Sequence, residues 1–394
     1  MDWEVFEVES LTRTAKIERG RLKILEGWKE RRVGVRVVEN GRVGFVTSNE
    51  FSKDLIEEAL KLAKISEEKL DRFPKGEFTK VEGIYDRRIE NLCPEDIREF
   101  VDEMVNSALS YRVNPSQGEV ELTVERVRIV NSLGTDMEYK STYCSAYLEC
   151  VCDGSSGFEV EESRSLIDFE DVGRKAGELA VASKNPEKIE GTYNVVLSPI
   201  AVHQILSYTL YPAITLENVL KGKSPLTDLG KNYLGNLTLI DDGTLAGGLF
   251  TFPFDDEGVG TKRKVVFDRG VLRTYLTDFR HALIANVSPT GNCIRGDDLY
   301  PRTSPTNVVL EFDEVAQLEG VYVHSLIGAH TSNPVSGDFS LETMNAFLGD
   351  KPVRAMIYGN VYNLIKKITA FGRDVRQVEN TVTPSIEFEE VKLV

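Results

Sequence analysis

The sequence predicts an α+β fold in which an N-terminal antiparallel sheet with packed helices is followed by a β-rich C-terminal domain. Short alternating apolar runs separated by glycine turns fill the first fifty residues, and amphipathic helix patterns come next. Beyond residue 190 most apolar runs are short and bounded by polar turns. A chain of 394 residues exceeds the size at which one hydrophobic core usually stops growing. We therefore expect two domains, 1–190 and 191–394.

The N-terminal sheet begins with a β-meander. The strand patterns at Val33–Val38 and Val43–Val46 flank Asn40-Gly41, which is the strongest short hairpin signal in the chain. Amphipathic helix patterns cover about 52–70 and about 94–110.

Strand patterns return over 119–164, and a third helix is expected over 169–183. Between Tyr143 and Cys152 the three cysteines occupy even positions, so they share one face of one strand. We interpret them as small buried apolar residues, because no C-x-x-C pair indicates a metal or redox site.

The second half is predicted to consist mostly of short strands. No repeat of 20 to 50 residues and no low-complexity tract interrupts them, which excludes a solenoid. The expected strands are Val195–Leu197, Leu237–Ile240, Lys264–Phe267, Leu272–Leu276, Val308–Phe312, Val321–Ile327 and Val353–Ile357.

The charge balance restricts the function classes. A formal net charge of −16 opposes direct binding to nucleic acid or anionic lipid, because both need clustered Lys and Arg. The acidic N-terminus does not resemble a secretory signal, and the most apolar window, 195–216, is interrupted by two prolines, a histidine and a glutamine. We expect a cytoplasmic protein that does not enter the membrane.

The segment SPIAVHQILSYTLYP, residues 198–212, predicts a buried helix that contains His203. A zinc peptidase helix carries two histidines and a glutamate on neighbouring turns, but here His203 stands alone. No two of the four histidines have a helical i, i+3 or i, i+4 spacing. We interpret His203 as a core histidine with satisfied hydrogen bonds.

Two loops carry the candidate site residues. Asp255, Asp256 and Glu257 precede a glycine, and on spacing alone they indicate a solvated turn with a capping acid. The second loop, Asn333–Ser340, follows His330 and is dense in turn formers, so it is either an ordered turn or the lining of a cleft. The candidate cleft residues are Asp255, Asp256, Glu257, His330, Asn333 and Asp338.

Taken in order, these features resemble the TldD/PmbA family, once described as modulators of DNA gyrase and understood as cytoplasmic peptidase subunits. The resemblance runs over nearly the whole chain. It rests on Val43-Gly44-Phe45, Asn131-Ser132-Leu133-Gly134, Phe254–Val259 with Thr261-Lys262-Arg263, Asn333–Ser340 and Gly359-Asn360-Val361.

The family that this chain resembles has two branches. In the TldD-like branch an H-E-x-x-x-H helix and a cysteine near the C-terminus hold zinc, and the glutamate is the general base. In the PmbA branch, also called TldE, this set is missing and the subunit pairs with a TldD-like partner. Here the region between Pro199 and Lys223 has His203 alone, and 372–384 has no cysteine. The resemblance therefore places the chain with PmbA.

The resulting expectation is a subunit that binds no metal and has no catalytic residue of its own, within a heterodimeric zinc metalloprotease that degrades or processes unfolded peptides. Zinc is expected in the TldD-like partner. One alternative is a free-standing homodimer that binds a peptide or small ligand without peptidase activity. A third possibility is a hydrolase whose unrecognised site combines the acids at 255–257 with His330 and Asp338.

Overall fold

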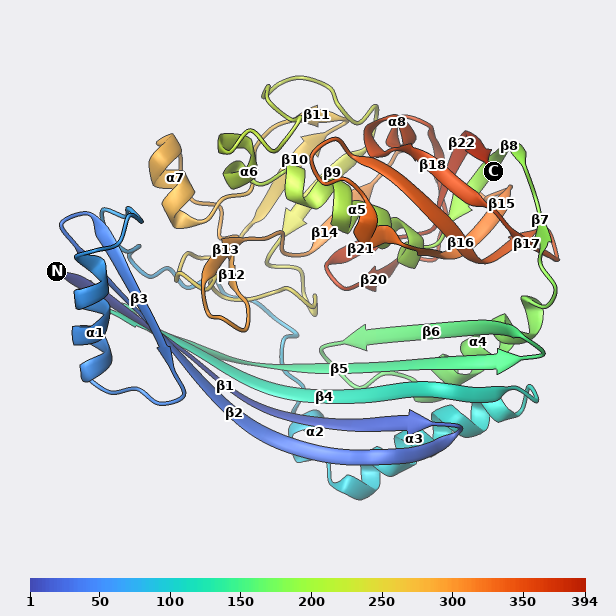
Figure 1. Cartoon of the computed structure of the whole chain (residues 1–394), viewed down its shortest axis with the longest axis horizontal. Helices are drawn as coiled ribbons and strands as arrows, with labels where there is room; N and C mark the ends of the chain where they lie inside the picture. The colour runs from blue at the N-terminus through green and yellow to red at the C-terminus, as the bar shows by residue number, and fades with distance from the viewer.

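The computed structural model describes residues 1–394 and has the predicted α+β architecture. Its first half is one antiparallel sheet of six strands in the order β3-β2-β1-β4-β5-β6. Figure 1 shows these long strands curving beneath the second half, with α3 and α4 on the outer face. The strands are β1 Asp2–Glu18, β2 Arg21–Glu39, β3 Arg42–Ser48, β4 Asn114–Asn131, β5 Asp136–Cys152 and β6 Ser155–Ser163.

The helices of the first half are α1 Asp54–Ala63, α2 Arg87–Asn91, α3 Pro94–Leu109 and α4 Phe169–Ala182. The helices predicted over 94–110 and 169–183 are confirmed. The prediction of a helix over 52–70 is wrong in length, since α1 ends at Ala63. Leu70 and Phe73 pack instead in a hydrophobic cluster at the edge of the sheet, so the chain leaves the helix before them.

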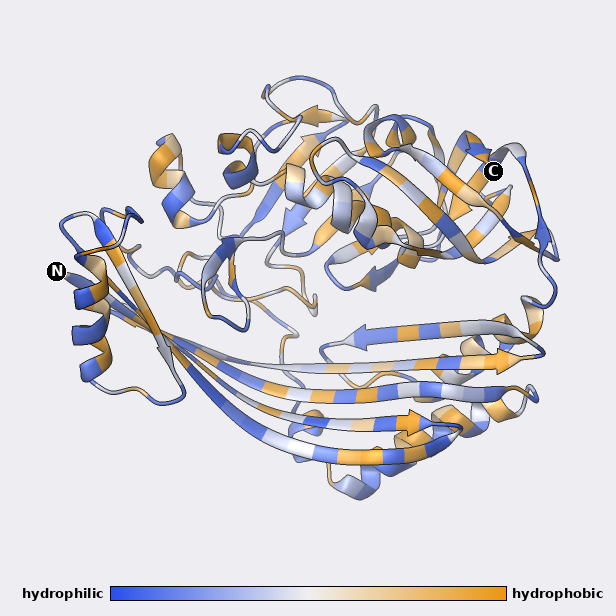
Figure 2. Ribbon diagram, in the orientation of Figure 1, coloured by the Kyte–Doolittle hydropathy of each residue, from blue (hydrophilic) through white to orange (hydrophobic).

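Apolar residues at alternate strand positions form the hydrophobic core between the sheet and the helices on its outer face. Figure 2 shows hydrophobic and hydrophilic residues alternating along β1 to β5, as expected for strands with one face packed on helices. Cys144 and Cys150 face this core and are fully buried, which confirms their interpretation as packing residues.

The second half contains an eight-stranded sheet, a six-stranded sheet and a two-stranded hairpin. Strands β15, β8, β22, β18 and β16 form a closed ring, because β15 also pairs with β16. The eight-stranded sheet and its branch comprise β7 Glu187–Lys188, β8 Gly191–Leu197, β15 Val321–Ile327, β16 Asp338–Leu348, β17 Lys351–Arg354, β18 Met356–Asn360, β19 Ile368–Phe371 and β22 Ile386–Leu393.

The remaining strands are β9 Thr238–Asp242, β10 Arg263–Asp268, β11 Val271–Leu272, β12 Cys293–Arg295, β13 Pro301–Thr303, β14 Val308–Glu311, β20 Arg376–Val378 and β21 Thr381–Thr383. The helices are α5 Pro199–Ala213, α6 Leu216–Leu220, α7 Phe279–Ala285, α8 Val361–Ile365 and the 3-10 turn η1 Ala329–Thr331. None of the helices has both the length and the apolar composition needed to cross a bilayer.

Two of the predicted strands differ in extent. The strand expected over Leu272–Leu276 ends at Leu272, since the following residues leave the sheet to reach α7. The strand expected over Val353–Ile357 is divided at Ala355 into β17 and β18, which both pair antiparallel with β16 in registers that differ by one residue.

The largest core cluster lies entirely in the second half, but two smaller clusters join the halves. Phe254 and Leu299 pack against the N-terminal sheet beside Phe6, and Val259 packs beside Val38. The segment 252–299 therefore belongs to the second half in sequence and shares its core with the first.

Candidate functional site

The acids at 255–257 form a turn within the junction between the halves. Asp255 Oδ1 accepts hydrogen bonds from the backbone N–H groups of Glu257 and Val259, both at 3.0 Å, so the predicted capping acid is present. The predicted solvent exposure is wrong, since Asp255 is 3% exposed and Glu257 is 1% exposed. Packing of this turn against the first sheet removes it from water.

A buried charge network surrounds the turn. Arg36 from β2 donates to Glu4 at 2.9 and 3.0 Å and to Glu257 at 2.9 Å, while Arg295 also donates to Glu4 Oε1. Glu257 also accepts the backbone N–H of Phe279 at 2.8 Å. The network therefore ties β1 and β2 to segments more than two hundred residues away.

Burial changes the acidity of these carboxyls. It raises the pKa of Asp255 well above its usual range, and it raises the pKa of Asp256 to about 7. Burial also raises the pKa of Glu257, against the opposing effect of Arg36. Because Arg36 bonds both Glu4 and Glu257, and Arg295 bonds Glu4 and the backbone carbonyl of Asp256, this arrangement holds the two halves together.

The second candidate loop does not meet the first. Asn333 Oδ1 accepts from the N–H groups of Val335 and Ser336, and Asp338 accepts from Ser336 Oγ at 2.6 Å and from Asn360 Nδ2 at 2.9 Å. These bonds close an ordered turn before β16. The turn shares no hydrogen bond with the acids at 255–257, and His330 is exposed beside it.

His203 lies in a polar cluster that sequence reasoning missed. Its Nδ1 is 2.8 Å from Thr381 Oγ1, its Nε2 is 3.4 Å from Glu379 Oε2, and Tyr211 shares the same threonine hydroxyl at 2.5 Å. His203 is 6% exposed, so it is a satisfied core histidine as predicted. Its hydrogen bond holds the pKa of Glu379 below the usual range.

This cluster brings together the two segments that the family resemblance assigns to zinc, α5 and 372–384. The donors present do not fit that zinc site: both ring nitrogens of His203 already have partners, two of the remaining groups are hydroxyls, and Glu379 is 63% exposed. The neighbouring Gln204 accepts the backbone N–H of Leu326 at 2.7 Å, which is a packing contact.

A cleft of about 970 Å³ separates β6 and α4 from the second half. Its lining includes Glu159, Glu161, His324, Asp374 and Arg376. Arg376 pairs with Glu159 at 2.7 Å and with Glu161 at 3.2 Å. Burial lowers the pKa of His324, consistent with its role as a neutral donor to a backbone carbonyl. No sequence signal identifies these residues, because they come from three separate segments, at 159–161, 324 and 374–376.

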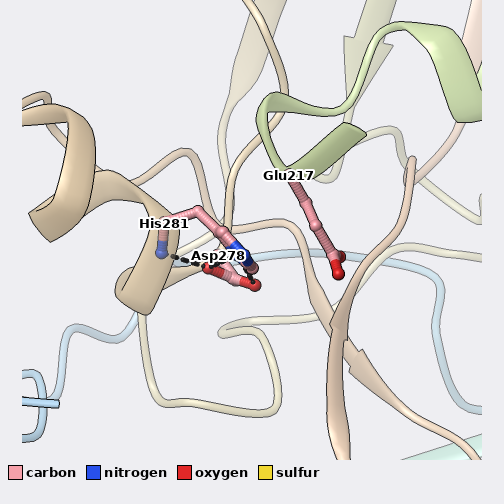
Figure 3. Close-up of side chains that lie close together, drawn as sticks. All are labelled: Glu217, Asp278 and His281. Carbon is pink, nitrogen blue, oxygen red and sulfur yellow. Dashed lines mark hydrogen bonds and ion pairs between the residues drawn. The ribbon is translucent and has the colours of Figure 1, made fainter. Parts of the chain in front are cut away.

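A third cluster contains Glu217, Asp278 and His281, whose ligand atoms lie within 4.8 Å of one another. Figure 3 shows these side chains converging from α6 and from the start of α7. It is the one group of three or more potential metal-ligating side chains with this spacing, and it involves neither His203 nor any of the candidate cleft residues.

Comparison with known families matches the chain along most of its length. Domain 1, the central domain and the C-terminal domain of PmbA/TldA metallopeptidases match residues 3–65, 87–184 and 190–394. An uncharacterized protein of Methanocaldococcus jannaschii is 34% identical, over 91% of this chain and 88% of its own length.

Two relatives occur in one organism, Buchnera aphidicola subsp. Acyrthosiphon pisum. A metalloprotease PmbA homolog is 25% identical over 67% of this chain and 61% of its own. A metalloprotease TldD homolog is also 25% identical, over 56% of this chain and 49% of its own.

Solved structures share the whole fold. A Thermotoga maritima protein described as a candidate modulator of a DNA gyrase is 26% identical, with a TM-score of 0.90 over 100% of this chain and 96% of that one. TldE from Thermococcus kodakarensis has a TM-score of 0.92 over the same shares at 24% identity, which shows likeness of fold. The chain belongs to the TldD/PmbA family.

Proposed function

We propose that this chain is the PmbA/TldE-type subunit of a heterodimeric zinc metalloprotease and that its TldD-like partner holds the catalytic zinc. The observation that carries the proposal is the cluster at His203. The two segments that would supply zinc ligands do meet in space, but they supply one engaged imidazole, two hydroxyls and an exposed carboxylate. A hydrolytic zinc needs three protein ligands and an open position for water.

The role of the chain would be to complete the partner's substrate channel, so that unfolded or extended peptide reaches the metal. A β-rich wall suits this task, because backbone groups can hold an extended peptide with little regard to its side chains. The cleft of about 970 Å³ is large enough for several residues of such a peptide.

The presence of PmbA and TldD homologs in one organism favours a pair of subunits over a lone homodimer. Capture of the tagged chain from its native cells tests this point. We expect a second subunit carrying H-E-x-x-x-H to be recovered with it. Recovery of a homodimer alone would favour the free-standing binding protein.

Peptide hydrolysis tests whether the partner, and not this chain, supplies the catalytic zinc. The purified chain alone should show no hydrolysis of an unfolded peptide, and addition of the captured partner should produce hydrolysis that a zinc chelator abolishes. His203→Gln in this chain should leave the rate of the pair within about twofold, because both ring nitrogens of this histidine are engaged by Thr381 and Glu379. Chelator-sensitive hydrolysis by the chain alone would contradict the proposal.

A further inference from the structure

One long edge of the first sheet has no paired strand. β3 pairs with β2 only over residues 33–39, so β2 has no strand beside it on that side over residues 21–32. In Figure 1, β3 lies beside only the left part of β2, and the rest of β2 forms the lower margin of the curved sheet. We call residues 21–32 the β2 edge. An unpaired strand of this kind is a template for pairing with another chain.

The alternation of hydrogen bonds identifies the backbone groups that point outward from this edge. The two-residue turn Asn40-Gly41 makes Glu39 and Arg42 a hydrogen-bonded pair, so every second residue of β2 from Glu39 backward points away from β1. No backbone group from a loop bonds to the outward residues of the β2 edge. These outward residues are Leu25, Gly27, Lys29 and Arg31. Each of them presents one N–H and one C=O group to a neighbouring strand.

The side chains of the β2 edge are also uncovered. Residues 26–31 are all exposed, and the large side chains of Trp28 and Ile24 are 43% and 42% exposed. These two lie on the same face of the sheet as Phe6, which packs beside Phe254 of the second half. The opposite edge, β6, is instead covered by side chains of the second half that donate to its carbonyls. The chain itself therefore covers one edge of this sheet and leaves the other open.

The β2 edge is basic, although the chain as a whole is acidic. It contains five Lys or Arg residues and two Glu residues, whereas the chain has a net charge of −16. Arg31 is paired with Glu7 and Glu9 of β1, but Lys29 is exposed and forms no ion pair. Opposite charges on facing strands are stabilising and like charges are destabilising. The β2 edge therefore suits a strand that carries carboxylates.

The same side chains disfavour pairing with the β2 edge of a second copy. A symmetric antiparallel pair centred on Glu26 would place this residue opposite its own copy, and a pair centred on Trp28 would place Glu26 opposite Glu30. A pair centred on the glycine between them would place Ile24 opposite Glu30. None of these registers sets a cation opposite a carboxylate, so a different chain fits the edge better.

We propose that the β2 edge pairs with an acidic strand of the TldD-like partner subunit, so that the first sheet continues into the partner. The inference rests on the subunit role proposed above, which is favoured by the occurrence of both kinds of homolog in one organism. Backbone hydrogen bonds would supply affinity, and carboxylates facing the Lys and Arg side chains would select this partner.

The affinity of the full chain for the recovered H-E-x-x-x-H subunit, measured by calorimetry, tests the inference. Gly27→Pro should weaken binding at least about tenfold, because proline has no N–H and its ring obstructs an added strand. The pairing of β1 with β2 is retained, since Gly27 points away from β1. Gly27→Ala keeps the N–H, and its new Cβ would meet nothing closer than 3.7 Å. It should therefore bind at least about tenfold more tightly than Gly27→Pro.

Lys29→Glu keeps the test decisive if the proline disturbs the sheet, because it leaves the backbone unchanged. It should weaken binding at least about threefold, since it replaces an attraction to carboxylates by a repulsion. Lys61→Glu is the control with the same change of charge. Lys61 is an exposed lysine on α1, and this variant should bind as the parent does.

The inference is overturned if the parent, Gly27→Pro and Lys29→Glu all bind the partner equally tightly, a result that leaves the subunit role intact. It is also overturned if Gly27→Pro separates a homodimer of this chain, or if it leaves the pair assembled and abolishes binding of an unfolded peptide. Failure of the parent itself to bind such a partner would refute the proposed subunit role, and this inference with it.

Discussion

Arg36 shows at the scale of a single residue how the two halves are held together. It is 4% exposed and donates to carboxylates from β1 and from the 255–257 turn. Desolvating a guanidinium is costly, and its two acidic partners offset that cost only while all three groups remain together. The triad of Arg36, Glu4 and Glu257 therefore stabilises one particular arrangement of these distant segments.

Replacement of Arg36 by Met should lower the free energy of unfolding by about 3–5 kcal/mol, because Glu4 and Glu257 would lose a buried cationic partner. Urea denaturation at neutral pH measures the change. Arg31→Met is the control, since Arg31 is exposed and its pairs with Glu7 and Glu9 are 3.4 Å long, so it should cost less than about 1 kcal/mol. An equal loss of unfolding free energy in both variants would show that the buried triad does not hold the two halves together.

Asp256 should make stability depend on pH. Burial raises the pKa of its carboxyl to about 7, so the folded protein holds this proton more tightly than the unfolded chain does. The contribution of this group to stability is complete below pH about 4 and is lost as pH rises toward 7.

Asp256→Asn should therefore lose less stability than the parent between pH 4.5 and 7.5, because the amide has no proton to release. The urea midpoint at each pH measures this difference. Asp102→Asn, an exposed change on α3, should leave the pH dependence of the parent unaltered. A parent-like pH profile for Asp256→Asn would exclude a raised pKa at this position.

At the scale of elements, close backbone approach fixes how α4 sits on α3. A Cβ added at Gly173 would lie 1.9 Å from the carbonyl oxygen of Met104, and one added at Gly44 would lie 1.8 Å from that of Ala59 on α1. Glycine is therefore needed at both contacts, because backbone atoms cannot move aside as a flexible side chain can.

Gly173→Ala should destabilise the protein by about 1–3 kcal/mol or more, because the two helices must separate to admit a methyl group. Thermal unfolding followed by circular dichroism measures this. Gly296→Ala is the control, as its nearest new neighbour would be 3.8 Å away. If both variants have the same melting temperature, the close packing of α3 against α4 does not contribute measurably to stability.

At the scale of the whole molecule, the second half protects the free edge of the first sheet. Three successive outward carbonyls of β6 are engaged: Ser156 accepts from Asn345 at 2.6 Å, Phe158 accepts from His324 at 3.1 Å, and Val160 accepts from Arg376. An uncovered edge would invite pairing with another chain. Side chains here substitute for a seventh strand.

Arg376→Gln should loosen this junction, because it removes a cation from the buried Glu159 and weakens one of the edge contacts. Amide hydrogen exchange in β6 should become at least about fivefold faster. Arg373→Gln is the control in the same loop, since Arg373 is exposed and forms no ion pair. Unchanged exchange in β6 would show that the edge is held without Arg376.

Much of the architecture could be predicted because it depends on local patterns. The Asn40-Gly41 turn adopts positive φ at both residues, as a tight hairpin requires, and the two longer predicted helices occur where their periodicity placed them. The helix around His203 was likewise predicted, since its neighbours are apolar over four turns. Local patterns did not show that Asp255 and Glu257 are buried, because their partners are remote in sequence.

The sequence by itself determined the fold class, the strand and helix patterns and the family resemblance, because these depend on residue types and their order. Only the tertiary structure decided which distant side chains meet. It joined His203 to Thr381, Arg36 to Glu257, and Glu217 to His281. Such contacts depend on how sheets curve and halves dock, and the periodicity of a single chain segment carries no information about its remote neighbours.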